Sequence, residues 1–261
     1  MAVTITEKER ELSYAKYWDR DLAPVHEDKL AISKGPSADP RKALKVENRN
    51  DFICGKDNGV NIGFCVMEDG TAFVANEAFW PGVTKEMFDW WFGWHSLEDL
   101  RYKIWDKEDH YYARADKPDY VRNPEVPVSQ KTWGVNHDIL EDIGLGEPDK
   151  LLLCFKCPSD LGYDLSKVGT KDCAAMVCAV GEGKAPALMT HMCQEVDGGI
   201  IFKSRFWMGY GLVNGEVVKV VPEGVTIPEI VPRSLFSHTI KEYANLAAIL
   251  PELYAEEKDN W

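Results

Sequence analysis

The sequence predicts an α+β fold in which an antiparallel sheet curls around a long C-terminal helix. Segments with the two-residue period of β-strands dominate the chain beyond residue 47. Asp69-Gly70 separates two of them, as in a tight hairpin turn. The last element, from Pro232 to Leu250, has instead the period of an amphipathic helix. A sheet wrapped around such a helix is a helix-grip fold, and the space between sheet and helix suits a bulky apolar ligand.

Composition places the 261-residue chain among soluble globular proteins, with 45% hydrophobic and 28% charged residues. It carries 30 Lys and Arg against 43 Asp and Glu, a formal net charge of −13. Nucleic acids and anionic membranes attract cationic surfaces, so we expect neither as a partner. The longest apolar run, Cys173–Val180, is far shorter than the roughly 20 residues that span a bilayer. The N-terminus lacks the apolar core of a signal peptide, so we expect a cytoplasmic protein.

The beginning of the chain differs in composition from the rest. Residues 5–20 have the pattern of a short charged amphipathic helix. Residues 21–47 contain three prolines and few apolar positions, which is typical of an irregular segment. We therefore expect an N-terminal helical arm over residues 1–47 and a helix-grip domain over residues 48–261.

The elements of the predicted domain follow in order. Two strands, Val60–Met67 and Thr71–Phe79, flank the hairpin turn. Thr84–Glu98 has apolar residues at helical spacing. Leu100, Tyr102 and Ile104 then alternate with charged residues, which indicates a strand. Further strands are expected at 133–143, 150–157, 172–180, 186–195, 199–212 and 215–221.

The C-terminal helix contains the most specific local signal. At 100° per residue one arc collects the apolar side chains Leu235, Phe236, Ile240, Tyr243, Leu246, Ala247, Ile249 and Leu250, and Pro251 should interrupt the helix. Glu242 falls inside this arc and His238 at its edge, roughly one turn apart, so the two could bind one metal ion. A carboxylate that faces a core is costly unless it is paired or metal-bound. The alternative is a solvated helix edge with a weak ion pair.

A metal ion would need further ligands from the sheet, and spacing alone does not select them. His95 continues the apolar stripe of the Thr84–Glu98 helix and is typical of a packed histidine. His137 and Glu141 would lie about 13 Å apart on one strand, too far to share an ion. His110 lies among acids and aromatics, and His191 lies on a predicted strand.

The seven cysteines are expected to be reduced and mostly buried, because the count is odd and no secretion signal precedes them. Cys154 and Cys157 form a CxxC, but a strand would point them to opposite faces, so we do not expect a thiolate metal site. The phosphate-binding loop, the serine-hydrolase GxSxG motif and the HExxH motif do not occur in the sequence.

Aromatic residues are concentrated between positions 79 and 112, where they make up eleven of 34 residues against 11% overall. They could line a pocket for an aromatic ligand. An aromatic-rich core or the face of a homodimer is the alternative.

Within this stretch, Trp90-Trp-Phe-Gly-Trp-His95 and the residues from Leu100 to Tyr111 resemble the 2,4-diacetylphloroglucinol hydrolase and phloretin hydrolase family. The resemblance extends through TWGVNHDILEDIG, THMCQE, SRFWMGYG and the final HxxxE, and covers most of residues 50–250. It implies a helix-grip fold like that of START domains and the birch pollen allergen. It also implies zinc-dependent cleavage of the carbon–carbon bond between an acyl group and a phloroglucinol ring.

The resemblance also implies roles for individual residues. The family binds zinc with two His and two Glu, and these correspond to His110, Glu141, His238 and Glu242. Tyr102, eight residues before His110, corresponds to a Tyr that contacts the substrate. His191 corresponds to a further substrate-contacting His, and Tyr210 to a second pocket Tyr.

The expected activity is therefore zinc-dependent hydrolysis of an acylphloroglucinol or a phloretin-like dihydrochalcone to phloroglucinol and a carboxylic acid. Zinc would hold the substrate, while Tyr102 and His191 would handle protons on its hydroxyls. The alternative is a noncatalytic helix-grip carrier of aromatic polyketides or flavonoids, which would have no need for stoichiometric zinc.

Overall fold

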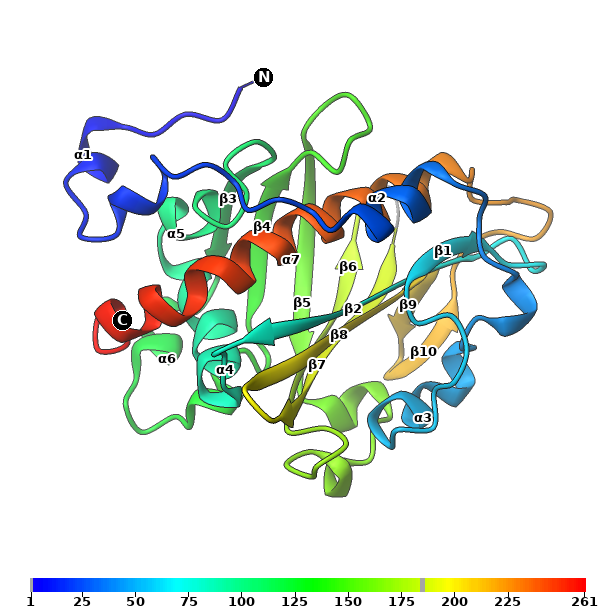
Figure 1. Ribbon diagram of the computed structural model, residues 1–261. Helices are drawn as coiled ribbons and strands as arrows, with labels where there is room; N and C mark the ends of the chain where they lie inside the picture. The colour runs from blue at the N-terminus through cyan, green and yellow to red at the C-terminus, as the bar shows by residue number, and fades with distance from the viewer. Residues whose placement is uncertain (1, 184–185) are drawn as a thin grey trace.

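The computed structural model describes residues 2–183 and 186–261, and its centre is an eight-stranded antiparallel sheet (Figure 1). The strands lie in the order β1-β2-β8-β7-β6-β5-β4-β3, while β9 and β10 pair separately. Their bounds are β1 Gly63–Val66, β2 Ala72–Pro81, β3 His110–Ala115, β4 Asn136–Glu141, β5 Asp149–Lys156, β6 Ala175–Glu182, β7 Ala187–Val196, β8 Gly199–Met208, β9 Tyr210–Val213 and β10 Glu216–Lys219.

The long helix α7 (Ile230–Glu257) lies across one face of this sheet (Figure 1). Its buried side consists largely of the predicted apolar arc, including Phe236, Ile240 and Leu246. The helix-grip prediction is confirmed by this arrangement of an antiparallel sheet around a C-terminal helix. Within the two described ranges, no helix has both the length and the apolar character needed to cross a membrane.

The register of the strands divides their side chains between two faces. The inner face, toward α7, includes Ile139, Phe155 and Phe202, which pack into one core with the helix. The outer face includes Met176 and Trp207, which pack against segments between residues 38 and 60. The site described below lies on the inner face.

Shorter helices surround the sheet. The α-helices are α1 Glu7–Arg10, α2 Glu27–Lys34, α3 Arg49–Ile53, α4 Lys85–Trp94, α5 Asp99–Lys103 and α6 Pro118–Arg122. The 3-10 turns are η1 Ala15–Tyr17, η2 Pro40–Lys42, η3 Val46–Asn48, η4 His95–Leu97, η5 Val128–Gln130, η6 Pro158–Leu161 and η7 Leu165–Lys167. The prediction of a helix at Thr84–Glu98 is met by α4 with η4.

The N-terminal segment departs from the prediction in two ways. The expected helix over residues 5–20 is reduced to α1 and the turn η1, and beyond α1 the side chains of Lys16 and Arg20 bind Glu252 of α7. The segment expected to be irregular contains α2, which lies beside α7. Lys29 of α2 donates to Asn76 of β2 at 2.6 Å, and such tertiary contacts stabilise a helix whose sequence has little amphipathic character.

Residues 100–104 were expected to form a strand and instead form α5. The charged residues of the alternating pattern are buried as well, so the pattern does not separate a buried face from an exposed one. Arg101 donates to the Trp94 carbonyl at 3.2 Å, and Lys103 pairs with Glu9 at 2.6 Å. The strand comes later, as β3, and its first residue is His110.

Two further boundaries differ from expectation. The expected strand 199–212 is divided into β8 and β9 at Gly209, whose φ of 88° turns the chain. Pro251 does not interrupt α7, which continues to Glu257. Contacts beyond the proline hold this last part in place: Leu253 is buried, and the Tyr254 ring lies 5.3 Å from the ring of Trp90.

The described residues contain all seven cysteines as free thiols, five of them buried, as predicted. The two members of the CxxC have different neighbours. Cys154 lies 3.8 Å from Glu182, whereas Cys157 lies 3.2 Å from Ser159.

Candidate metal centre

Four of the predicted site residues meet at one buried point on the inner face. His110 Nε2 lies 3.2 Å from His238 Nε2, 3.6 Å from Glu242 Oε2 and 3.8 Å from Glu141 Oε2. The distance from His238 Nε2 to Glu242 Oε2 is 3.9 Å. Two imidazole nitrogens and two carboxylates from three separate elements therefore face a common centre.

The strand register explains why His110 and Glu141 meet. They are direct partners in the β3–β4 ladder, and a shift of register follows between His110 and Tyr112. This irregularity places His110 rather than Tyr111 opposite Glu141, as β-bulges commonly re-aim a side chain. His238 and Glu242 reach the same point from one face of α7, one helical turn apart.

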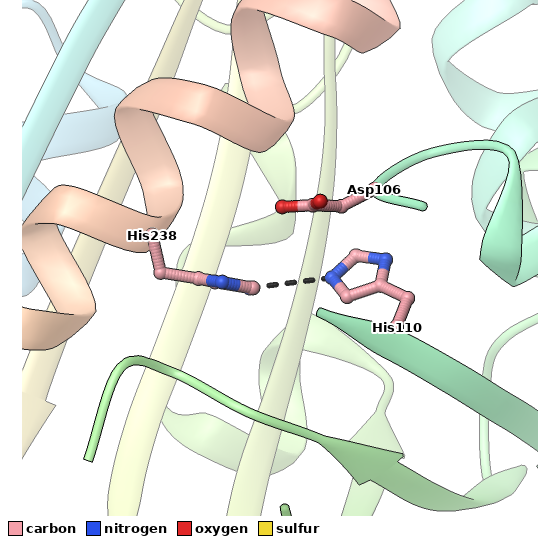
Figure 2. Close-up of side chains that lie close together, drawn as sticks. All are labelled: Asp106, His110 and His238. Carbon is pink, nitrogen blue, oxygen red and sulfur yellow. Dashed lines mark hydrogen bonds between the residues drawn. The ribbon is translucent and has the colours of Figure 1, made fainter. Parts of the chain in front are cut away.

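A third carboxylate lies beside the two histidines. Figure 2 shows Asp106, His110 and His238 directed toward one another, and their ligand atoms lie within 4.8 Å of each other. Asp106 is fully buried, and its Oδ2 accepts no hydrogen bond from the described residues, although Lys241 Nζ lies 3.2 Å away. Asp106 is not among the residues expected at the site from the sequence, where its one signal is its place in the acidic run directly before His110.

Each histidine of the centre is oriented through its other nitrogen. His110 Nδ1 lies 3.2 Å from the Tyr102 carbonyl oxygen. His238 Nδ1 lies 3.4 Å from Asp109 Oδ2, and Asp109 in turn accepts a hydrogen bond from Lys241. Such contacts fix the tautomer and the ring direction of a metal-binding histidine.

The charges of the centre are poorly balanced by the protein alone. Burial raises the pKa of Glu242 well above its usual range, although His238 opposes the shift. Burial also lowers the pKa of His110 well below its usual range, and the nearby His238 lowers it further. Burial opposes charge on His238 too, but Glu242, Asp109 and Glu141 outweigh it and raise its pKa to about 10. A divalent cation would supply the positive charge that these carboxylates lack, so the donor set fits one.

Tyr102 connects this centre to the aromatic part of the inner face. Its ring stacks on His110 at 3.9 Å between centroids, and its hydroxyl donates to Glu141. Burial raises the pKa of Tyr102 well above its usual range, with a further contribution from Glu141. The phenol is therefore a neutral donor at the edge of the centre.

Tyr210 does not join this group. It lies on β9, beyond the turn at Gly209, where the chain has left the main sheet. Its hydroxyl is 3.5 Å from Asp69 Oδ2, and it lines a cavity of about 590 Å³ whose walls include Trp207 of the outer face. The turn at Gly209 thus places the Tyr210 ring away from the four converging side chains, and its role as a second substrate-binding Tyr stays a prediction.

Comparison with known proteins gives the family of the chain. Residues 44–255 match the family described as "DAPG hydrolase PhiG domain". The chain belongs to this DAPG hydrolase family. It is 55% identical to the phloretin hydrolase of Eubacterium ramulus over 262 residues, which cover 99% of this chain and 95% of that protein. It is 25% identical to a 2,4-diacetylphloroglucinol hydrolase of a Pseudomonas species, over 95% of this chain and 89% of that protein.

Among solved structures, that of Ara h 8.0201 covers 70% of this DAPG hydrolase family member and 99% of its own chain, with 8% sequence identity and a TM-score of 0.44. The first two of these relatives carry the names of hydrolases, which agrees with the resemblance inferred from the sequence.

In this DAPG hydrolase family member, His191 faces the same core from β7. Its ring lies 5.4 Å from Phe92 and 5.7 Å from Tyr243, the neighbour of Glu242. It is 2% exposed, and its Nδ1 has no hydrogen-bond partner in the described part of the chain. Burial lowers its pKa to about 3, so the imidazole is neutral. No contact joins it to the four converging side chains, which distinguishes it from them.

Proposed function

We propose that this protein is a zinc-dependent hydrolase that cleaves the aryl–acyl carbon–carbon bond of an acylphloroglucinol or a phloretin-like dihydrochalcone. One observation carries the proposal: His110, Glu141, His238 and Glu242 converge on one buried point in a chain of the DAPG hydrolase family. The names of the relatives, phloretin hydrolase and 2,4-diacetylphloroglucinol hydrolase, support the substrate class.

The four converging side chains would hold the zinc ion. Nitrogen and oxygen ligands of this kind suit zinc, and Asp106 is close enough to influence it. When bound, zinc acts as a Lewis acid that polarises a carbonyl or phenol oxygen. The Asp109 carboxylate would keep His238 Nε2 directed at the ion through its contact with Nδ1.

The reaction consumes one water molecule. The ring carbon first takes a proton, because an aryl carbanion is a very poor leaving group, and a polyphenol ring accepts this proton readily through its keto tautomer. The water oxygen then bonds to the acyl carbon, and the aryl–acyl bond breaks with its electron pair returned to the ring. Of the two hydrogens of the water, one balances the proton on the ring carbon and the other stays with the carboxylic acid. The products are phloroglucinol and a carboxylic acid.

Two residues would assist the reaction without holding the metal. His191 is neutral and has a free nitrogen, so it would exchange a proton with a ring hydroxyl. The Tyr102 hydroxyl, beside Glu141, would orient a substrate oxygen next to the metal. The aromatic residues between them, such as Phe92 and Trp105, would pack against the substrate ring.

The test is to incubate the purified protein with phloretin and with mono- and diacetylphloroglucinol, and to measure released phloroglucinol beside zinc content. We expect release, about one zinc per chain, and loss of activity with a chelator that zinc restores. Binding of these compounds without release, and without zinc, would identify a carrier. Release that is unaffected by complete zinc removal would refute the role of the metal.

A further inference from the structure

His137, like His110 and His191, lies on the inner face of the sheet, and it has an unpaired nitrogen that the proposed mechanism does not use. His137 lies on β4, four residues before Glu141 and on the same side of the strand. Four residues of strand span about 13 Å, so His137 lies well away from the candidate metal centre. Its ring lies 4.5 Å from Phe155 and 5.3 Å from His95.

His137 is buried, and one of its two ring nitrogens has no protein partner in the described part of the chain. It is 1% exposed, and its Nδ1 has no hydrogen-bond partner among residues 2–183 and 186–261. The neighbouring His95 is equally buried, but its Nδ1 lies 2.9 Å from the Trp91 carbonyl oxygen. Because an unpaired buried polar group is costly, we infer that the free Nδ1 of His137 forms a hydrogen bond with a bound ligand.

The surroundings of His137 limit what this partner is. Its partner across the β4–β5 ladder is Leu153, and the next inner-face residue along β4 is Ile139. Leu153 and Leu151 remain partly exposed although they face α7, so apolar inner surface is left for a ligand to cover. Apolar walls with one hydrogen-bonding imidazole match an aromatic ring that carries a single hydroxyl. A ring with three hydroxyls matches the polar metal centre better.

We propose that His137 is a specificity-determining residue that hydrogen-bonds the hydroxyl of the second, acyl-side ring of a dihydrochalcone. This inference rests on the proposed function, because that reaction places the phloroglucinol ring and the carbonyl at the metal centre. The acyl chain then carries the second ring along β4, toward His137. A short acetyl group would not reach His137.

The test compares phloretin with the otherwise identical dihydrochalcone that lacks the hydroxyl on its second ring. We expect the native protein to prefer phloretin by roughly tenfold in kcat/KM, the scale for leaving a buried polar group unpaired. His137→Phe should abolish this preference by slowing phloretin alone, and should leave zinc content and the turnover of monoacetylphloroglucinol unchanged. His137→Gln keeps a hydrogen-bonding group and should retain part of the preference.

The matched control is His95→Phe, which changes the adjacent buried histidine whose Nδ1 is already paired. It should alter both dihydrochalcones equally and leave their ratio intact. If His137→Phe does not fold, as judged by circular dichroism, His137→Leu takes its place. A preference for phloretin that survives in the apolar variant would overturn the proposal. If the native protein hydrolyses no substrate, the proposed function fails, and equilibrium binding of the two dihydrochalcones still tests His137.

Discussion

Asp109→Asn is the sharpest perturbation of the candidate metal centre that leaves its four proposed ligands intact. Asp109 Oδ2 is shared between His238 Nδ1, at 3.4 Å, and the ammonium group of Lys241. The substitution keeps the size of the side chain but removes the negative charge that holds the His238 ring. Changes of this kind at a metal-binding histidine cost about 10- to 100-fold in metal affinity. We expect a loss in this range, equivalent to about 1.4–2.8 kcal/mol.

The assay is a competition titration of zinc against a chromophoric chelator, which measures metal affinity independently of turnover. Glu108→Gln is the matched control, because Glu108 also pairs with Lys241, at 3.1 Å, but is mostly exposed and has no contact with His238 among those found in the described residues. Its zinc affinity should equal that of the native protein. Native affinity in Asp109→Asn, or an equal loss in both variants, would refute the argument that Asp109 acts by orienting His238.

Three further predictions concern the centre and the core around it. Replacing any proposed ligand with alanine should lower zinc occupancy, measured by metal analysis, and abolish turnover; these ligands are His110, Glu141, His238 and Glu242. His95→Ala and His137→Ala should retain zinc. His191→Ala should keep its full zinc complement and lower kcat by at least ~100-fold, the scale for a lost general acid–base group. Loss of zinc would show that His191 is a metal ligand, and unchanged kinetics would show that it has no catalytic role. Leu246→Ala, at a fully buried position of α7, should lower the free energy of unfolding in urea by about 2–5 kcal/mol, and a native value would mean that α7 does not anchor the core.

The parts of the fold that sequence predicts well are those whose burial repeats along a short segment. The strands β6 and β7 are buried over most of their length and β8 alternates in burial along its first half, and both patterns are visible in the residues themselves. The apolar arc of α7 is equally local, and it includes Glu242 because that carboxylate faces the candidate centre.

The features that local sequence does not reveal have a common physical cause, since each depends on partners distant in sequence. Residues 100–104 alternate between apolar and charged residues, which suggests a strand with one exposed face. Arg101 and Lys103 are nevertheless buried, because they bind Tyr14 and Glu9 of the distant N-terminal segment. The place of Tyr210 depends on the turn at Gly209 and on pairing with β10, which moves it to the outer side. Spacing alone leaves Glu141 and His137 open as partners of His110; the family resemblance selects Glu141, which the irregular β3–β4 register pairs with His110.

The candidate centre itself depends on the position of α7 along the sheet, because His110 and His238 are 128 residues apart in sequence. The segment between α5 and β3 helps to fix this position through hydrogen bonds to α7. Trp105 Nε1 donates to the Glu242 carbonyl at 3.0 Å, and Asn245 Nδ2 donates to the Ile104 and Trp105 carbonyls at 3.1 and 2.9 Å. A slip of α7 by one turn, about 5.4 Å, would break all three bonds and carry His238 and Glu242 out of reach of His110. The buried Trp105 and Asn245 therefore help to assemble the centre, although neither would bind the metal.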